Sequence, residues 1–332
     1  MMDRVHLDPA SGFGRIPLEP YQMTSRLTDA DDVIVLCHLG VPQVDAESWS
    51  ITIDGLVEHP RAFSLAELRT FPYVEIEAFH QCAGNPMEPS RPTQRVSNVM
   101  WGGYRLADVV ASVQPRPEAK YVWSFGADWG TFDGVAIDAY AKDLPLARIA
   151  DDVLIAESMN GALLTPEHGF PLRLVVPGFY GTNSVKWLTR MTFAAERSDG
   201  PFTTRWYNDP IMQNGQPTGR TQPVWAVAPQ SVIVDPWPRA QVQLGMPVEI
   251  WGWAWADAGV GSVVIEGGAG DLRIAATVEP RRGRSWQRFS AMWRPETTGR
   301  QRLGARAVDT NGAVQPDDGA RNAIHWVEVV VK

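Results

Sequence analysis

The sequence predicts an α+β fold, with a mixed α/β domain over residues 1–215 followed by an all-β, immunoglobulin-like sandwich over residues 216–332. Two observations support this division. The 26 prolines and 29 glycines among 332 residues indicate many turns and short strands rather than long helices. In addition, helical periods occur only before residue 208, whereas the chain after residue 240 contains strand-like segments separated by turns.

Local patterns predict elements of both types in the first domain. Residues 49–56 alternate between polar and apolar side chains, as in a half-buried strand. Ser64 and Glu67 have the spacing of a capping box, which predicts a short helix, and residues 105–113 have apolar side chains at helical spacing. Further strands are expected at residues 74–79, 121–125 and 172–176.

The boundary between the domains is expected within residues 208–224. This segment holds three prolines and two glycines among polar residues, a composition that interrupts regular structure and is typical of a linker. The sequence therefore predicts an irregular connection at this point.

The second domain is expected to form its sandwich from residues 240–255, 261–267, 272–278, 286–293, 301–308 and 323–331. In the first of these segments Trp251, Trp253 and Trp255 share one face of a strand, because successive side chains alternate. The opposite face is also apolar, and two apolar faces exceed what one sandwich core needs. Two interpretations stay open: the tryptophan face meets the first domain or a second subunit, or it belongs to a tryptophan-rich core.

Composition and charge exclude several classes of partner. A net charge of −8 and a pI near 5.3 disfavour nucleic acids and anionic membranes, both of which attract basic surfaces. No segment approaches the roughly 18 apolar residues of a membrane span, and no export signal is visible at the N-terminus. Small molecules or proteins are the expected partners, and a cytoplasmic location is the default, with a periplasmic one if a leader was removed.

Cys37 and Cys82 are the only cysteines, too few for a four-cysteine zinc site or a disulfide framework. Cys82 follows a β-like run and precedes Gly84 and Asn85, so its thiol is expected at a strand end that a ligand can approach. The residues alone leave two interpretations open for Cys82, a functional thiol or a small buried hydrophobic residue.

Three basic side chains, His168, Arg173 and Lys186, fall within one short stretch that is rich in turns. Such loops bring backbone N–H groups and cations together, which suits an anionic group such as phosphate. An ordinary charged surface is the alternative.

Several motifs occur in a fixed order, namely Cys82-Ala83-Gly84-Asn85, Met159-Asn160-Gly161, His168 to Arg173, Pro177-Gly178 and Val185-Lys186-Trp187-Leu188. Together they resemble the molybdopterin domain of the sulfite oxidase superfamily, over roughly residues 33–207. The segment beyond the linker, with residues 305–309 and 315–316, resembles the C-terminal dimerisation domain of that family.

The resemblance implies that Cys82 gives a thiolate to molybdenum, with a pyranopterin dithiolene and oxo groups completing the coordination. It also implies that Tyr207 lies beside the metal oxo group and that Trp101 lines the substrate pocket, so Cys82, Tyr207 and Trp101 are the expected catalytic residues. For Trp101, His38 and His80, a structural role stays open. The residues implied in cofactor binding are His38, His80, Cys82, Asp128, His168, Arg173, Ser184 and Lys186.

Two positions depart from the family. Leu36 and Met87 stand where the resemblance places arginines that grip sulfite, and a third cation falls in a shortened loop near Arg321. Each charge-assisted contact contributes about 1.5–3 kcal/mol, so losing two weakens binding by roughly two to four powers of ten. Leu36, Met87 and Trp101 would instead line a more apolar pocket, for a neutral or larger substrate such as an S-oxide. The alternative is that Arg91 or Arg321 replaces the missing cations.

The sequence thus predicts a molybdopterin-dependent oxidoreductase that transfers an oxygen atom to or from a small substrate other than sulfite. A sulfite dehydrogenase with relocated cations and a cofactor-free binding protein on the same scaffold are the alternatives. Because no haem motif or cytochrome b5-like segment is found, no haem is expected, and electrons would leave to a separate carrier. The C-terminal domain is expected to form a homodimer.

Overall fold

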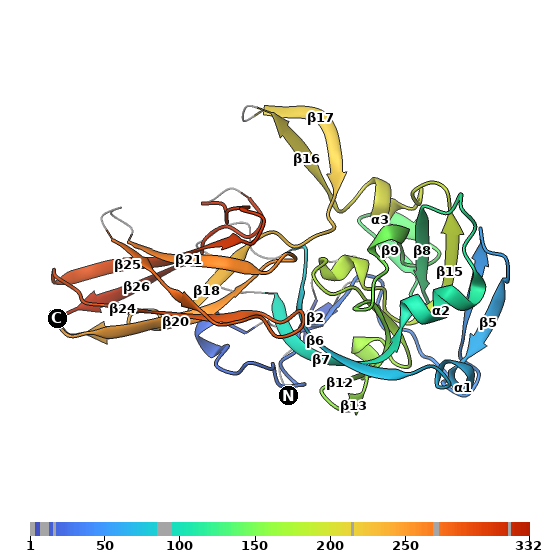
Figure 1. The fold of residues 1–332 in the computed structure, drawn as a ribbon, viewed down its shortest axis with the longest axis horizontal. Coiled ribbons are helices and arrows are strands. Elements are labelled where there is room, and N and C mark those ends of the chain that lie inside the picture. Colours follow the sequence, from blue (N-terminus) through green and yellow to red (C-terminus); the bar gives the residue numbers. More distant parts are fainter. Residues whose placement is uncertain are drawn as a thin grey trace. The chain divides into compact units, whose positions relative to one another are not determined.

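A computed structural model describes residues 4–6, 13–15, 18–84, 95–213, 216–267, 272–317 and 320–332. It consists mainly of β-strands with few helices and includes a C-terminal sandwich, which confirms the predicted fold class (Figure 1). The chain forms two compact units. The first comprises Met1–Ile16, Ile34–Ile76 and Met100–Trp225, and the second comprises Pro17–Val33, Glu77–Val99 and Ala226–Lys332.

One five-stranded sheet of the first unit has the order β11-β8-β15-β4-β5. Its strands are β4 (Ser50–Gly55), β5 (Arg61–Ser64), β8 (Tyr121–Gly126), β11 (Ala141–Pro145) and β15 (Leu188–Ala194). β15 pairs parallel to β4 and antiparallel to β8. The alternation seen in residues 49–56 is confirmed, because Ile51 and Ile53 are fully buried in the core of this unit.

A second sheet has the order β13-β12-β7-β6, and β14 also pairs with β12. Its strands are β6 (Tyr73–Gln81), β7 (Val96–Arg105), β12 (Leu154–Met159), β13 (Ala162–Leu163) and β14 (Arg173–Val175). Asn160 and Gly161 join β12 to β13 with φ angles of 53° and 79°, as a two-residue hairpin turn requires. β6 ends directly before Cys82, so this thiol lies at a strand end as predicted.

The helices are short and follow their sequence signals. They are α1 (Leu65–Leu68), α2 (Leu106–Val113) and α3 (Pro201–Thr204). The backbone N–H of Glu67 donates to Ser64 Oγ at 3.2 Å, and the Glu67 carboxylate accepts from Ser64 N at 2.9 Å, which confirms the capping box. The side chains that α2 buries are spaced by three or four residues, as a helix with one apolar face requires: Leu106, Val109, Val110 and Val113.

Several short elements complete the first unit and the start of the second. β1 (Arg4–His6), β2 (Phe13–Arg15) and β3 (Leu36–Cys37) form a small sheet, and β9 (Gly130–Phe132) pairs with β10 (Val135–Ile137). The 3-10 helices are η1 (Pro20–Gln22), η2 (Leu146–Arg148), η3 (Pro166–His168) and η4 (Gly181–Asn183). Within the described ranges no helix is both long and apolar enough to span a membrane.

The second unit contains the predicted sandwich, drawn in orange and red in Figure 1. Its two sheets have the orders β18-β20-β24-β23 and β19-β26-β25-β21-β22. The strands are β18 (Gln230–Asp235), β19 (Gln241–Val242), β20 (Val248–Trp255), β21 (Val260–Gly267), β22 (Arg273–Ala275), β23 (Thr277–Val278), β24 (Gln287–Trp293), β25 (Gly299–Asp309) and β26 (Trp326–Val331). Every segment predicted as strand contains one, whereas β18 was not predicted.

The tryptophan face of β20 is covered within its own unit. Trp253 stacks on Trp286 with the ring centroids 5.0 Å apart, and its Nε1 donates to the carbonyl of Met23 at 2.7 Å. Trp255 donates from Nε1 to Gln81 Oε1 at 2.7 Å. The opposite face of β20 faces the sandwich core. The second apolar face is therefore explained by contacts with Met23, Phe79 and Gln81, which the sequence had assigned to the first domain.

The prediction of an irregular linker over residues 208–224 is wrong. β16 (Asn208–Gln213) pairs antiparallel with β17 (Gln216–Pro223), so most of this segment is a two-stranded hairpin. Its side chains are mostly exposed. Each strand of an isolated hairpin has one free edge, and an edge tolerates the missing N–H of a proline.

Candidate active site

Arg173 is almost completely buried, with 3% of its surface exposed. It begins β14, and its guanidinium donates to the carbonyl oxygens of His168 at 3.0 Å and Ser184 at 3.2 Å. Burial lowers the pKa of Arg173 to about 9, because these uncharged acceptors replace water only in part. An anionic group beside the guanidinium would stabilise its charged form.

Gly169 brings the predicted cations together. It has a φ of +106°, and a Cβ at this position would lie 3.1 Å from the Cβ atoms of both Arg173 and Lys186. A side chain here would press against the stems of both cations, and the positive φ also favours glycine. Beside it, Nδ1 of the buried His168 lies 2.8 Å from the hydroxyl of Thr165, which fixes the imidazole ring.

The Lys186 side chain contacts two other segments of the chain. Its half-buried ammonium donates to the carbonyl oxygens of Leu36 and Glu167 and to Cys37 Sγ, each at 2.9 Å. None of these acceptors is a carboxylate. Cys37 and Cys82 are both buried free thiols, so the two form no disulfide.

Asp128 and Ser184 lie in the surroundings of Lys186. A Cβ on Gly126 would come within 2.4 Å of Asp128 Oδ1 and 2.7 Å of the Lys186 carbonyl, so only glycine permits this close approach. Burial raises the pKa of Asp128 to about 6, although the charge on Lys186 opposes the shift. The hydroxyl of Ser184 accepts from the Val176 backbone N at 3.0 Å and thereby connects the loop to β14.

His38 and Tyr207 form a close pair. The imidazole Nε2 and the phenol oxygen are 2.5 Å apart. Burial, with a further contribution from the charge on Lys186, lowers the pKa of His38 to about 4, so the ring is neutral at neutral pH and can accept the phenol proton. Tyr207 has a φ of +57°, a conformation that costs energy for a tyrosine. The aromatic rings that surround His38 are Phe132, Tyr140 and Phe202.

Trp101 is fully buried, and the guanidinium carbon of Arg173 lies 4.9 Å from its ring centroid. This cation–π contact holds the Arg173 side chain in place. A packing role for Trp101 is therefore visible, whereas its predicted role in lining a substrate pocket stays a prediction.

Cys82 belongs to the second unit and is buried, with 8% of its surface exposed. Its Sγ accepts from the Gly84 backbone N at 3.3 Å. Arg321 donates from Nε to the carbonyl of Ala83 at 2.7 Å, and Arg95 donates to the carbonyl of Gly84 at 3.1 Å. Burial raises the pKa of the Cys82 thiol, whereas the neighbouring guanidinium groups of Arg95 and Arg321 favour the thiolate.

Sequence reasoning missed Arg95, which lies in none of the motifs. Its place beside Cys82 comes from a backbone contact, in which Cys82 N donates to the carbonyl of Arg95 at 2.8 Å.

Leu36 lies on β3. Its backbone carbonyl accepts a hydrogen bond from Lys186, and its side chain is uncharged. Met87 and Arg91 lie outside the described residues. His80, on β6, is half-buried, and its role in cofactor binding stays a prediction.

These residues fit a phosphate-bearing pterin cofactor. Arg173 and Lys186 present cationic groups on either side of Gly169, and a phosphate would accept charge-assisted hydrogen bonds from them. In the second unit, Cys82 offers a single soft ligand, which suits molybdenum bound mainly by its own dithiolene. Within the part of the chain that is described, no group of three or more His, Cys, Asp or Glu side chains could hold a metal ion by itself.

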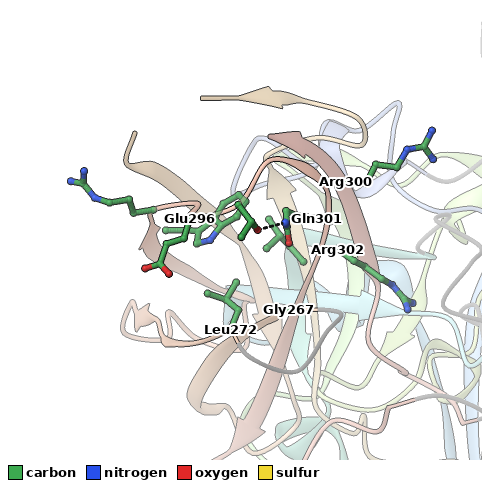
Figure 2. A pocket seen from close by; sticks show the side chains of 10 residues that line it. Gly267, Leu272, Glu296, Arg300, Gln301 and Arg302 are labelled. Atoms are coloured by element: carbon green, nitrogen blue, oxygen red, sulfur yellow. Dashed lines mark hydrogen bonds between the residues drawn. The ribbon is translucent and has the colours of Figure 1, made fainter. Parts of the chain in front are cut away.

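A pocket of about 790 Å³ opens on the sandwich, between residues of β24, β25 and the end of β21 (Figure 2). Leu272, Trp293 and Leu303 give it apolar walls, while Arg294, Arg300 and Arg302 border it. It contains none of the residues that the sequence predicts for the site. The pocket is therefore not the candidate active site.

Comparisons with known proteins agree with this chemistry. Residues 38–202 match the family "Oxidoreductase molybdopterin binding domain". Sulfite oxidase of Gallus gallus is 32% identical over 313 residues, which cover 85% of this chain and 66% of the relative. Sulfite oxidase of Arabidopsis thaliana is 33% identical over 217 residues, covering 59% of this chain and 54% of the relative. The chain thus spans only 54% to 66% of the length of these two relatives.

Among solved structures, the sulfane dehydrogenase SoxCD from Paracoccus pantotrophus superimposes with a TM-score of 0.80. The two are 26% identical, and the match covers 98% of this chain and 88% of the other. The family match, the relatives and this likeness agree with the ordered motifs and with the cations around Gly169. The chain belongs to the sulfite oxidase superfamily of molybdopterin oxidoreductases.

Proposed function

We propose that this chain is a molybdenum cofactor-dependent oxidoreductase that transfers an oxygen atom to or from a small substrate other than sulfite. The observation that carries the proposal is the packing of two cations, Arg173 and Lys186, against Gly169, within the segment that matches the molybdopterin-binding family. A phosphate can accept charge-assisted hydrogen bonds from both cations, so an anionic cofactor suits this pair. Residues 1–215 would form the cofactor-binding domain and residues 216–332 the dimerisation domain.

The residues of the chain would bind and orient the cofactor. Cys82 would give its thiolate to molybdenum, and Arg173, Lys186 and Ser184 would hold the terminal phosphate. His168 and Asp128 would contact the pterin, with His80 as a further contact. When bound, the cofactor would supply the two-electron redox chemistry.

His38 and Tyr207 would control a proton at the substrate. The Tyr207 hydroxyl and the neutral imidazole share a hydrogen bond of 2.5 Å, so the hydroxyl is held at His38. A substrate oxygen that competes for this hydroxyl would receive a hydrogen bond from a donor whose position is already fixed. Tyr207 would therefore orient substrate, and Trp101 would shape the pocket.

The substrate proposal depends on Leu36. An arginine at this position would face a doubly charged anion, whereas a leucine gives no donor, and the cost of desolvating such an anion stays uncompensated. A reduced sulfur compound with less charge than sulfite fits better. The likeness to the sulfane dehydrogenase SoxCD supports sulfane sulfur as one such substrate class.

A second candidate function is sulfite oxidation with relocated cations. Arg95 and Arg321 favour it, because both guanidinium groups border the predicted metal ligand Cys82. These two arginines would then supply the contacts that Leu36 and Met87 lack.

Elemental analysis and steady-state kinetics test the proposal together. Purified protein should contain about one molybdenum per chain, whereas a cofactor-free binding protein would contain none. With an artificial electron acceptor, sulfane and S-oxide substrates should give higher kcat/KM than sulfite. Efficient turnover of sulfite would instead establish the second candidate. Electrons would pass to a separate carrier, with no haem in the chain, and a homodimer through the sandwich would be the active form.

A further inference from the structure

Two buried amide side chains stand next to Cys82 and Arg321 in the sequence. Gln81 precedes Cys82, Asn322 follows Arg321, and both amide residues are completely buried. Gln81 Nε2 donates to Asn322 Oδ1 at 2.6 Å, although the residues are 241 positions apart. This hydrogen bond, the Gln81–Asn322 bridge, links the segment with the thiol to the loop with the guanidinium.

The orientation of both amides is fixed by further partners. Gln81 Oε1 accepts from Trp255 Nε1 at 2.7 Å, and its Nε2 also donates to Gln230 Oε1 at 3.0 Å. Asn322 Nδ2 donates to the carbonyl of Ala228 at 2.8 Å. Because donor and acceptor ends both have partners, neither amide can rotate without leaving a buried polar atom unsatisfied.

The backbone at Asn322 has a special conformation. Its φ is +65°, which an asparagine tolerates better than most residues, and its carbonyl accepts from Gln315 Nε2 at 3.1 Å. One residue earlier, Arg321 Nε donates to the carbonyl of Ala83 at 2.7 Å. The two segments are therefore joined at two successive points, by Gln81 with Asn322 and by Ala83 with Arg321.

We propose that Gln81 and Asn322 are positioning residues that hold the Arg321 guanidinium beside Cys82, where it contacts an anionic group of the substrate. The proposal rests on the proposed function for the role of Cys82. An arginine on a free loop would lose side-chain entropy on binding an anion, whereas a loop fixed by buried amides has already lost it. The bridge would thus strengthen anion binding without touching the anion.

Asn322→Gly is the most informative variant. Glycine adopts a φ near +65° without strain, so the loop keeps its backbone path while the amide disappears. Gln81→Met removes the same bridge from the other side with a side chain of similar length. Ser231→Ala is the matched control, because Ser231 is buried in the same region and bonds Gln315 and Ala305 but neither bridging amide.

Sulfate is the probe, and its binding to the full chain is measured by isothermal titration calorimetry, which needs no turnover. Arg321→Met should weaken sulfate binding about tenfold or more, as expected for one lost charge-assisted contact. Asn322→Gly and Gln81→Met should each approach this loss, and Asn322→Gly should add nothing when Arg321 is already methionine. Ser231→Ala should lower thermal stability but leave sulfate affinity unchanged.

Two results would overturn the proposal. The first is that the wild-type protein does not bind sulfate. The second is that the variants of Gln81 and Asn322 bind sulfate as tightly as the wild type. Either result would show that the bridge positions no anion contact. Molybdenum is quantified in the same samples. Wild-type protein without molybdenum would refute the proposed function, while the sulfate affinities would still decide the role of the bridge.

Discussion

Replacing Lys186 with methionine should release the cofactor while the fold persists. The ammonium makes three hydrogen bonds of 2.9 Å, to Leu36, Cys37 and Glu167. Methionine has a similar length and leaves little empty volume, so the variant loses mainly a charge and its donors.

Two magnitudes follow from this geometry. One charge-assisted contact to phosphate contributes about 1.5–3 kcal/mol, so cofactor retention should weaken about 10- to 150-fold. The charge on Lys186 also lowers the pKa of both His38 and Asp128. In the variant the pKa of His38 should therefore rise above about 4 and that of Asp128 above about 6.

Molybdenum and pterin content after gel filtration measure the first effect, and an NMR titration of the His38 ring in cofactor-free protein measures the second. Lys120→Met, which removes an exposed lysine of the same unit, is the control and should change neither. Unchanged cofactor content together with an unchanged His38 pKa would refute the assignment, because Lys186 would then be an ordinary surface cation.

Four further predictions test other parts of the site. Cys82→Ser should abolish molybdenum retention and redox activity with an unchanged circular dichroism spectrum, and normal turnover would contradict the metal-ligand assignment. Leu36→Arg, alone or with Met87→Arg, should raise kcat/KM for sulfite about tenfold or more, so an unchanged value would count against the missing-cation argument. Asp128 has a raised pKa, so its ionisation costs stability as the pH rises from about 4 to about 6. Over this range the free energy of unfolding of the wild type should fall by about 3 kcal/mol relative to Asp128→Asn, measured by urea denaturation, and a constant difference would contradict it. Light scattering at micromolar concentration should report a dimer, and a monomer would refute the predicted assembly.

Short sequence patterns correctly predicted those elements whose structure depends on neighbouring residues. The Ser64 capping box, the apolar face of α2 and the alternation around Ile51 all have the predicted structure, because each depends on residues within a few positions. β7 escaped prediction for a physical reason. Most of its side chains are buried on both faces, and its sequence mixes serine, asparagine and glycine with apolar residues, so no alternation marks it as a strand.

The missed parts of the site depend on long-range contacts. No local pattern announces that Gln81 will meet Asn322 or that Arg95 will lie beside Cys82, because the chain segments involved meet only in the folded protein. The same holds for residues 17–33. Backbone carbonyls in this segment accept hydrogen bonds from the indole N–H groups of two sandwich tryptophans. A domain boundary predicted from composition alone therefore cannot show that residues 17–33 belong to the same unit as the sandwich.

Which charged side chains can reach a substrate is likewise decided by the folded chain and cannot be read from single sequence positions. The proposed preference for a substrate other than sulfite rests on Leu36 and Met87, whose side chains carry no charge. Arg95 and Arg321 come from other segments, yet their guanidinium groups both favour the Cys82 thiolate. Each already donates to a backbone carbonyl of the turn after Cys82, so part of its hydrogen-bonding capacity holds that turn. The choice between sulfite and a less charged sulfur substrate therefore depends on whether these two guanidinium groups contact the bound substrate.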